Sequence, residues 1–203
     1  MKALVICGGS LFNKDILIKK INKQYDCTIA VDSGYNYAKE LDIEPTILIG
    51  DLDSIKKYDS KIPIIEYSPI KDDTDLKLAL DYCIDNCYKE IDIICATGKR
   101  IDHMLNNISL LSYLDNKNIV ARIIDEYNTI SVLKKYNHID NISKYVSIIP
   151  ITEKIVYSSN NLIYKADRLE VKNINILSIS NQANNITFDI ELHNGKALLI
   201  QSD

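Results

Sequence analysis

The first 125 residues alternate between short apolar runs and longer amphipathic segments, and this alternation most constrains the fold. The apolar runs are continuous, which is typical of strands buried on both faces of a parallel sheet. They cover residues 2–7, 27–32, 46–49, 63–67, 91–96 and 119–125. Helical spacing of apolar residues covers roughly 12–24, 35–41, 72–88 and 102–114, and a short helix is expected after Ser54. Alternating strands and helices with short connections predict an α/β fold with a doubly wound, mostly parallel sheet.

From about residue 130 the pattern changes, because helical spacing ends and short β-rich runs separated by Asn, Ser and Gly take over. These runs cover 144–150, 153–157, 162–164, 169–171, 174–180, 186–192 and 196–201. Closely spaced strands with turn signals predict an all-β sandwich or barrel. We therefore expect an α/β domain over residues 1–130 and a C-terminal β-sandwich over 131–203. A sandwich of only about 70 residues has a small core, so a dimer partner that buries one of its faces is expected.

Composition excludes several classes of function. The net charge of −4 and the pI of about 5.4 argue against a nucleic-acid partner, since such proteins usually carry a concentrated basic face. No apolar run of about 18 residues is present, so no membrane span is expected. The N-terminus enters a strand-like run without a signal-peptide pattern, which predicts a cytoplasmic protein. The five cysteines lack CxxC spacing and are expected to be free thiols, most of them buried.

Two carboxylates follow the run at 46–49 and Gly50, at positions i and i+2. If this run is a parallel strand, Asp51 and Asp53 lie at its carboxyl end, where open α/β sheets bind their ligands. Like charges this close repel each other, so the pair favours a bound cation. Hard oxygen ligands suit Mg²⁺, which also binds substrate phosphates. The alternative is a solvated turn, because Gly, Asp and Ser all favour turns.

Further candidates follow the other strands: Asp32, the cluster Asp72, Asp73 and Asp75, and the loop from Gly98 to His103. That loop leads into a helix, whose N-terminal N–H groups favour anions, and Arg100 adds a planar donor fork suited to phosphate. Carboxylates for a metal opposite donors for phosphate describe a nucleotide-phosphate site. The sequence has no Gly-x-x-x-x-Gly-Lys-[Ser/Thr] loop and no Gly-x-Gly-x-x-Gly, which argues against P-loop enzymes and dinucleotide dehydrogenases.

These stretches, in this order, resemble the thiamine pyrophosphokinase family. Gly50-Asp-Leu-Asp-Ser54 matches the family's Gly-Asp-x-Asp-Ser, and Lys71-Asp-Asp-Thr-Asp75 matches its Lys-Asp-x-Thr-Asp. Ala96-Thr-Gly-Lys-Arg-Ile-Asp-His103, followed by Asn107, matches Gly-Gly-Arg-x-Asp-His with its Asn. Asp32-Ser-Gly34 is similar to an Asp-Gly-Gly turn. In the second half, Ser180-Asn181 is similar to a Ser-Asn pair that contributes to the family's thiamine site.

The resemblance implies the reaction ATP + thiamine → AMP + thiamine diphosphate, with Mg²⁺, in a homodimer that binds thiamine at the subunit interface. It implies catalytic roles for Asp51, Asp53, Asp75 and Asp102, the first three also as metal ligands. It implies that ATP and its phosphates are bound by Asp32, Ser54, Lys71, Asp72, Thr74, Gly98, Arg100, His103 and Asn107. It implies that thiamine is bound by Ser180 and Asn181. Either Asp75 or Asp102 could accept the proton of the attacking hydroxyl.

The sequence also departs from the family's pattern. Lys99 replaces the second Gly of the Gly-Gly-Arg turn, so it costs strain if that position needs a positive φ and otherwise adds a cation beside the phosphates. Cys95 stands where many relatives have Gly at the start of this loop. The family's pattern near residues 161–169 and the Gly before Ser-Asn are not kept, so the sandwich half is the more divergent one.

Three other interpretations fit the same residues. One is a Mg²⁺-dependent diphosphotransferase or nucleotide phosphohydrolase that acts on another heterocyclic alcohol, such as a pterin. Another is a non-catalytic module that senses thiamine or nucleotide. The third is an α/β protein whose acidic turns are merely solvated. His138 and His193 have no partners at ligand spacing and are expected on the surface.

Overall fold

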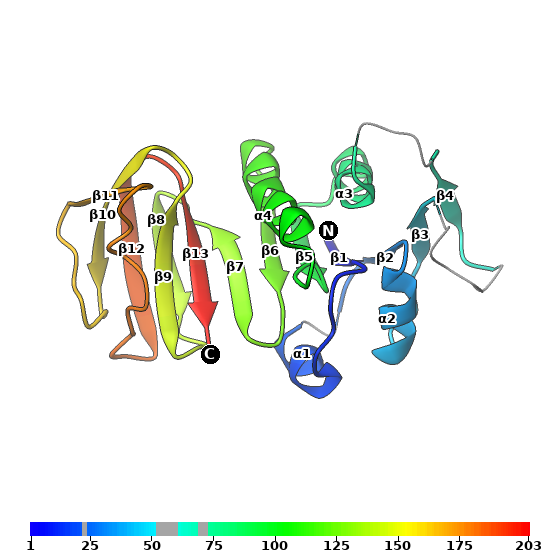
Figure 1. Ribbon diagram of the computed structural model, residues 1–203, viewed down its shortest axis with the longest axis horizontal. Helices are drawn as coiled ribbons and strands as arrows, with labels where there is room; N and C mark the ends of the chain where they lie inside the picture. The colour runs from blue at the N-terminus through cyan, green and yellow to red at the C-terminus, as the bar shows by residue number, and fades with distance from the viewer. Residues whose placement is uncertain (22–23, 52–60, 69–72) are drawn as a thin grey trace. The chain divides into compact units, whose positions relative to one another are not determined.

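The structure is a computed structural model that describes residues 1–21, 24–51, 61–68 and 73–203. The chain divides into two compact units, Met1–Glu126 and Tyr127–Asp203. Figure 1 shows their elements in chain order. Residue 130, where the sequence pattern changes, lies inside β7 (Asn128–Val132), the first strand of the second unit. Among the described residues, no helix has both the length and the apolar content needed to cross a lipid bilayer.

The first unit is built on a parallel sheet with the strand order β4-β3-β2-β1-β5-β6. Its strands are β1 (Lys2–Ile6), β2 (Cys27–Val31), β3 (Ile47–Gly50), β4 (Ile64–Glu66), β5 (Glu90–Ile94) and β6 (Val120–Ile124). In the register, Val5 of β1 lies between Ile29 of β2 and Ile93 of β5. All three side chains are fully buried. The central strands are thus covered on both faces, which explains their continuous apolar runs.

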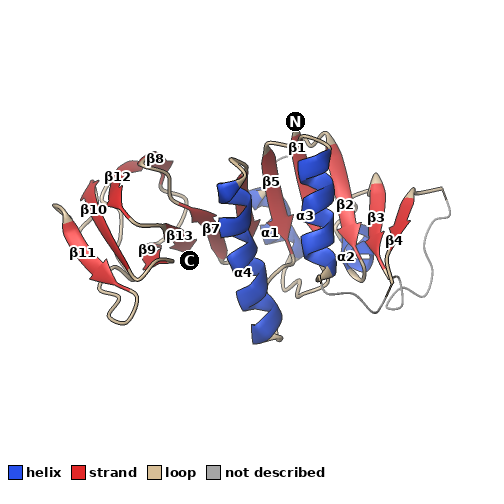
Figure 2. Cartoon of the chain, turned by 90° about the horizontal axis from the view of Figure 1, so that it is seen from above, coloured by secondary structure: helices blue, strands red, loops and turns tan. Residues whose placement is uncertain are grey.

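Helices cover both faces of this sheet, with α1 and α2 on one side and α3 and α4 on the other (Figure 2). They are α1 (Lys14–Lys20), α2 (Gly34–Glu40), α3 (Asp75–Asp85) and α4 (Ile101–Asn116). Asn13 caps α1 by accepting hydrogen bonds from the N–H groups of Asp15 and Ile16. The helix predicted over 12–24 is shorter because Ile21 leaves the helical region, with φ −91° and ψ 154°.

A buried carboxylate ties the sheet together away from the carboxyl ends of its strands. Asp92 of β5 accepts hydrogen bonds from Arg122 Nε at 2.9 Å and Tyr25 Oη at 2.8 Å, and forms an ion pair with Lys2 at 2.9 Å. Lys2 and Tyr25 lie at the amino ends of β1 and β2. The contacts compensate for the cost of burying this charge.

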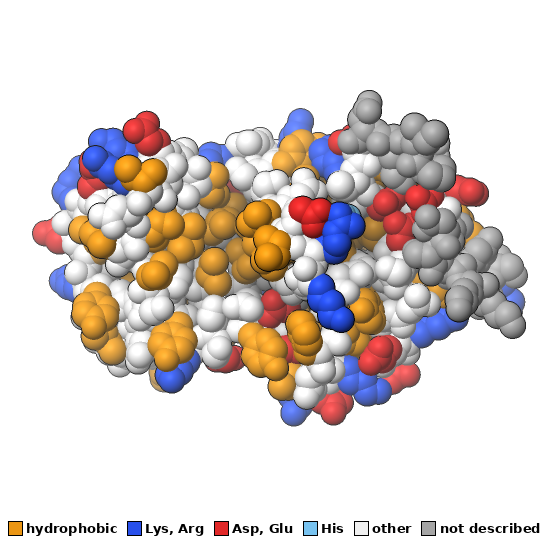
Figure 3. Space-filling model, in the orientation of Figure 1, with side chains coloured by type: hydrophobic (Ala, Val, Ile, Leu, Met, Phe, Trp, Pro, Cys, Tyr) orange, Lys and Arg blue, Asp and Glu red, His pale blue; other side chains and the backbone are white. Residues whose placement is uncertain are grey.

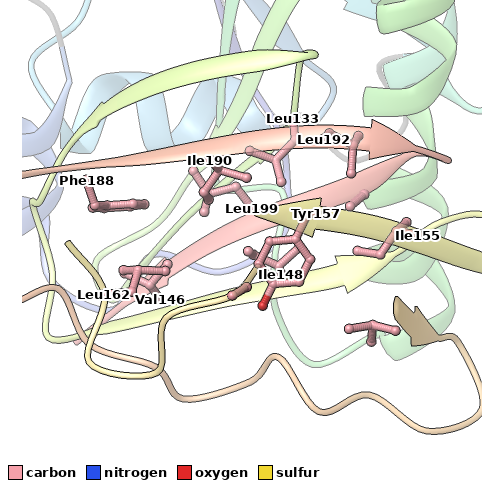
Figure 4. Close-up of a cluster of buried hydrophobic side chains, with 13 residues drawn as sticks. Leu133, Val146, Ile148, Ile155, Tyr157, Leu162, Phe188, Ile190, Leu192 and Leu199 are labelled. Atoms are coloured by element: carbon pink, nitrogen blue, oxygen red, sulfur yellow. The ribbon is translucent and has the colours of Figure 1, made fainter. Parts of the chain in front are cut away.

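The second unit contains two antiparallel sheets, β7-β13-β9 and β11-β10-β12-β8. After β7, its strands are β8 (Tyr136–Asp140), β9 (Tyr145–Pro150), β10 (Lys154–Asn160), β11 (Leu169–Lys172), β12 (Thr187–Asn194) and β13 (Ala197–Ser202). Burial alternates along β9, β10 and β12, as expected for strands with one face on a core. Tyr157 and Phe188 are the largest buried side chains of that core (Figure 4).

The predicted combination of a parallel α/β sheet with a separate antiparallel, sandwich-like part is confirmed. The strand predicted over 174–180 is wrong, because this segment contacts β9 only at single points. The N–H of Ile148 donates to the carbonyl of Ser178 at 2.7 Å, and Val146 exchanges backbone hydrogen bonds with Asn181. The run 162–164 is reduced to an isolated bridge at Leu162, and β7 and β8 were not predicted. The short helix expected after Ser54 lies outside the described residues.

Candidate active site

A cleft of about 510 Å³ opens at the carboxyl ends of the parallel strands. It is formed by the loops after β1, β2 and β5 together with the beginnings of α3 and α4. Its lining residues are Cys7, Gly8, Gly9, Ser10, Val31, Asp32, Ser33, Tyr37, Thr74, Asp75, Leu76, Ala96, Thr97, Gly98, Lys99, Arg100, His103, Met104 and Asn107. Open α/β sheets bind their ligands at this end.

The cleft brings together many of the residues predicted from the sequence. They are Asp32, Thr74, Asp75, Gly98, Arg100, His103 and Asn107. Asp51 and Asp102 are described but are not among the residues that line it. Asp51 directly follows β3 and is half-buried, whereas Asp102 is exposed on the first turn of α4. Asp53, Ser54, Lys71 and Asp72 lie outside the described residues.

Asp32 lies in a strained turn against the end of β3. Its φ is 45°, an uncommon conformation for a residue other than glycine. Its N–H donates to the carbonyl of Ile49 at 3.0 Å, and its own carbonyl accepts from the N–H of Tyr35. Gly50 has a φ of +151°, and a Cβ there would overlap the carboxylate of Asp32. A glycine at position 50 therefore makes room for the Asp32 side chain at the mouth of the sheet.

The loops after β1 and β5 are joined by backbone hydrogen bonds. The N–H of Gly9 donates to the carbonyl of Cys95, and the N–H of Ser10 donates to that of Thr97, both at 2.8 Å. Gly98 has a φ of +152°, and a Cβ there would crowd Ser10. The two loops form one continuous wall of the cleft.

Helix α4 begins beside that wall and is tied to it. The Asn107 side chain donates to the carbonyl of Ala96 at 2.8 Å, which holds the loop after β5 against the helix. Asn106 donates to Thr74 Oγ1 at 3.5 Å, and Thr74 in turn caps α3 by accepting from the N–H of Lys77. The beginnings of α3 and α4 are thus linked, and Asp75 is the first residue of α3.

Arg100 and Asp102 form an exposed ion pair. The guanidinium donates from Nε to Oδ1 at 3.0 Å and from Nη2 to Oδ2 at 2.5 Å. The hydrogen bonds from Arg100 hold the pKa of Asp102 well below its usual range, with help from the backbone N–H of His103. Asp102 is therefore ionised throughout the physiological range and is a weak proton acceptor.

Two departures from the family's pattern have different structural consequences. Cys95 has a φ of 53°, so the backbone keeps a conformation that favours glycine although a side chain is present. Lys99 does not have a positive φ. Its exposed side chain therefore adds a cation to the cleft wall without that strain.

The donor chemistry of the cleft suits a hard cation. Its titratable ligands include the carboxylates of Asp32 and Asp75, and oxygen ligands fit Mg²⁺. The Cys7 thiol also lines the cleft, and burial raises its pKa, so without a metal it is a neutral thiol. Within the described parts of the chain, no group of three or more His, Cys, Asp or Glu side chains is arranged to hold a metal. Asp53 and Asp72 lie outside those parts.

Ser180 and Asn181 lie in the second unit and have different environments. Ser180 is exposed with a φ of 56°, and its N–H donates to Ser147 Oγ at 3.0 Å. Asn181 is buried, and its side chain accepts from the N–H groups of Tyr164 at 3.0 Å and Gln182 at 2.9 Å. It also donates to the carbonyl of Tyr164 at 2.8 Å. The Asn181 carboxamide thus holds the Tyr164 segment in place.

A larger hollow of about 670 Å³ lies over β8, β10 and β12 of the second unit. Polar pairs link neighbouring strands there: His138 Nδ1 lies 2.7 Å from Asp189, and Ser158 lies 2.8 Å from Nε2 of His193, which is not itself a lining residue. Such cross-strand pairs are ordinary on the solvent face of a sheet. We therefore place the active site in the smaller cleft, where the strained turns and most described candidates converge.

Several cleft residues were not predicted as site residues from the sequence. They are Cys7, Gly8, Gly9, Ser10, Ser33, Tyr37, Thr97 and Met104. The available signal was Gly8-Gly9-Ser10, because a glycine pair directly after the first strand permits a close backbone approach. Tyr37 gave no local signal, since its Oη donates to the carbonyl of Gly9 across a separation of 28 residues.

A parallel sheet with a cleft of carboxylates and glycine turns at its carboxyl ends defines an α/β protein with a small-molecule site. Comparison with known proteins narrows this class. Residues 18–123, just over half of the chain, match the family model of the thiamin pyrophosphokinase catalytic domain. The chain belongs to the thiamin pyrophosphokinase family.

Individual relatives agree with this assignment. The thiamine pyrophosphokinase of Bacillus subtilis is 32% identical over 164 residues, which cover 76% of this chain and 77% of that protein. The crystal structure of a thiamine pyrophosphokinase from Bacillus subtilis has a TM-score of 0.89 and 27% identity, and covers 100% of this chain and 99% of that one. The thiamin pyrophosphokinase structure from Candida albicans has a TM-score of 0.78 at 18% identity, with coverage of 100% and 89%, and supports the fold alone.

Proposed function

We propose that the chain is a thiamine diphosphokinase, which transfers a diphosphate group from ATP to the hydroxyl of thiamine and releases AMP. The observation that carries this proposal is the cleft itself. It gathers Asp32, Asp75, Arg100 and Lys99 at the carboxyl ends of the strands, in a chain that belongs to this family. In this proposal the first unit is the doubly wound, ATP-binding catalytic domain, and the second unit binds thiamine.

The phosphates of ATP would lie against the loop after β5 and the beginning of α4. Arg100 is the N-cap residue of this 16-residue helix, and its side chain makes no capping hydrogen bond. The first turn of a helix favours an anion, and here the N–H of His103 already donates to the Asp102 carboxylate. Lys99 and Arg100 add positive charge at the same place, with His103 and Gly98 beside them. Asn107 keeps this loop in position through the carbonyl of Ala96.

The carboxylates Asp51, Asp53 and Asp75 would hold Mg²⁺. When bound, the ion would neutralise part of the charge of the phosphate chain. Asp51 directly follows β3 and Asp75 begins α3, so both lie at the same end of the sheet. Asp32, fixed over Gly50, would complete the acidic side of the cleft. Ser54, Lys71, Asp72 and Thr74 belong to the same proposed ATP site.

The reaction requires a group that accepts the proton of the attacking hydroxyl. The pKa of Asp102 is lowered by its hydrogen bonds from Arg100, so a proton on this carboxylate is unfavourable. We therefore assign proton acceptance to Asp75, which lines the cleft and would keep one carboxylate oxygen for this role if the other binds Mg²⁺. The thiamine oxygen would then attack the β-phosphorus in line, and AMP would leave. Positioning and charge stabilisation supply most of the catalysis in such transfers.

Thiamine would bind between two subunits, with Ser180 and Asn181 on the second unit contributing. Support comes from exposed apolar side chains in the same unit (Figure 3). Ile174, Leu177 and Ile179 are more than half exposed in the segment that leads to Ser180. Exposed apolar side chains close in sequence favour a protein interface, and a homodimer would cover them. The cytoplasmic location expected from the sequence stays part of this proposal.

The test is release of AMP from ATP that depends on both thiamine and a divalent cation. AMP and thiamine diphosphate in equal amounts are expected, and Mg²⁺ should be effective. ADP as the nucleotide product, or equal turnover with a pterin alcohol in place of thiamine, would contradict the proposal. Binding of both ligands without turnover would indicate a sensor instead.

A further inference from the structure

Two buried carboxylates at the end of β6 lie outside the cleft wall but are connected to it. Asp125 and Glu126 directly follow Ile124, the last residue of β6, and are 5% and 2% exposed. Neither lines the cleft. Buried acidic side chains are costly unless hydrogen bonds compensate them, so their partners indicate what they do.

Each carboxylate holds one of the two loops that form the cleft wall. Thr97 Oγ1 donates to Asp125 Oδ2 at 3.0 Å, which ties down the loop after β5. Glu126 Oε1 accepts from the N–H of Phe12 at 2.6 Å and from the N–H of Asn13 at 2.9 Å, which ties down the loop after β1. Asp125 and Glu126, the two anchors, are adjacent in the sequence, so a displacement of the backbone at one of them also displaces the other.

The loops meet between these anchors. Gly9 and Ser10 donate their N–H groups to the carbonyls of Cys95 and Thr97, each at 2.8 Å. Among the described residues, Glu126 Oε2 is buried and accepts no hydrogen bond. An oxygen in that position adds a desolvation cost that a smaller side chain would avoid. The Glu126 carboxylate therefore contributes through Oε1, the oxygen that accepts from the N–H groups of Phe12 and Asn13.

We propose that Glu126, together with Asp125, positions the Gly8-Gly9-Ser10 loop and the loop after β5 so that both face the phosphates of ATP. Glu126 is then a positioning residue of the nucleotide site, which acts through the backbone of Phe12 and Asn13. This inference rests on the proposed function. Its structural part, the anchoring of the loop, can be measured without ATP.

The test compares Glu126→Ala with Asp92→Ala in the full-length protein. Asp92 is an equally buried carboxylate of the same unit, but its partners lie at the amino ends of the strands. Both variants should lower the melting temperature. Only Glu126→Ala should weaken binding of a non-hydrolysable ATP analogue, by about tenfold or more, since small misplacements of binding groups are expensive. If either alanine variant does not fold, Glu126→Met and Asp92→Leu replace the pair, because these side chains fill the space without an acceptor oxygen.

Glu126→Gln keeps an acceptor oxygen for Phe12 and Asn13, so it should restore affinity to within about threefold of the wild type. Amide hydrogen exchange supplies a readout independent of ATP. In Glu126→Ala, exchange should accelerate at Gly9, Ser10, Phe12 and Asn13, whereas in Asp92→Ala it should not. Unchanged exchange at these amides would overturn the inference. Equal loss of affinity in both alanine variants would also overturn it. If the wild type binds no ATP analogue, the proposed function fails, and hydrogen exchange still decides the anchoring.

Discussion

Arg100 and Asp102 face each other as a two-pronged ion pair at the entrance of α4, with donor–acceptor distances of 3.0 and 2.5 Å. The guanidinium expected to bind phosphate thus already has an anionic partner. The pair also keeps Asp102 ionised at low pH, because its hydrogen bonds from Arg100 lower the pKa of that carboxyl group. Asp75 and Asp102 are the two carboxylates considered as proton acceptors, and the ion pair with Arg100 makes Asp102 the less suitable of the two.

Asp75→Asn should lower kcat by on the order of a hundredfold, because a carboxylate that lines the cleft is lost. Asp102→Asn should lower kcat by less than about tenfold, since its carboxylate is not the proton acceptor. Steady-state kinetics at pH 7.5 with thiamine and MgATP measures both. The reverse order would transfer the acceptor role to Asp102. The acid limb of the wild-type pH profile should remain in Asp102→Asn, because a group with a depressed pKa does not titrate there.

Lys99→Met should raise the KM for ATP by about three- to tenfold, because one charge-assisted contact to phosphate is lost. The effect should be larger at low ionic strength, where exposed charges are less screened. Lys117, just beyond the other end of α4, provides the matched control. Lys117→Met should leave the KM for ATP unchanged. Equal values for the two variants would remove Lys99 from the ATP site.

Gly50→Ala should displace the Asp32 carboxylate and lower the free energy of unfolding by about 1–3 kcal/mol, because φ is +151° and a Cβ would overlap Asp32. Activity should fall with it. Gly195 also has a positive φ, +79°, and lies in the second unit against Lys154. Gly195→Ala should lower the melting temperature as well, but leave the KM for ATP unchanged. Calorimetry measures the loss of stability in both variants, and kinetics measures activity and the KM for ATP. A loss of activity confined to Gly50→Ala would show that the Asp32 site, and not backbone strain in general, is affected.

Ser180→Ala should raise the KM for thiamine more than the KM for ATP, because Ser180 is exposed beside the proposed thiamine site. Asn181→Ala should act differently. Its buried carboxamide makes three hydrogen bonds to Tyr164 and Gln182, so its loss should lower the free energy of unfolding by about 1–3 kcal/mol. Urea denaturation measures this loss. An unchanged KM for thiamine in Ser180→Ala would show that the Ser-Asn resemblance is accidental.

Thiol titration should distinguish one cysteine from the other four. Cys87 is exposed, and the others are buried. Burial raises the pKa of Cys95 to about 12 and that of Cys83 to about 12, so both are neutral thiols at pH 8. One thiol should react rapidly with a disulfide reagent in the native protein, and all five should react after denaturation.

The same thiols predict a loss of stability in alkali. In the unfolded chain a thiol ionises near pH 8.5, whereas the folded protein holds Cys95 and Cys83 protonated to about pH 12. The folded state therefore binds more protons between these values, and the free energy of unfolding decreases as pH rises through this window. Denaturant midpoints measured between pH 8 and 10.5 should fall for the wild type and fall less for Cys83→Ala.

The sequence predicted the fold well where burial was simple. Continuous apolar runs marked β1, β2, β3 and β5 because both faces of these strands are covered. The prediction of a strand over 174–180 failed because these apolar residues have the composition of a strand, yet Ile174 is 88% exposed and lies in none of the strands. The spacing of apolar residues along the sequence does not show whether a segment such as 174–180 is buried in a sheet or exposed.

The site was predictable where residues follow a strand directly. Asp32 and the Gly98–Arg100 loop were found because parallel strands bring their carboxyl ends together. Glu126 and Tyr37 could not be found, since each reaches the loop after β1 from a distant part of the chain. The Arg100–Asp102 ion pair could not be predicted either. The two residues lie where a loop enters α4, and the relative direction of their side chains depends on the backbone conformation of that turn.

The joining of the loops after β1 and β5 has a consequence for biosynthesis. The cleft wall combines residues 7–13 with residues 95–100, and its anchors are residues 125 and 126. A ribosome must therefore release nearly two thirds of the polypeptide before the pocket can close. Until then the Gly8-Gly9-Ser10 loop lacks the carbonyl groups of Cys95 and Thr97 to which it donates in the folded protein. Nascent chains stalled before that point should gain no protection from nucleotide against proteolysis.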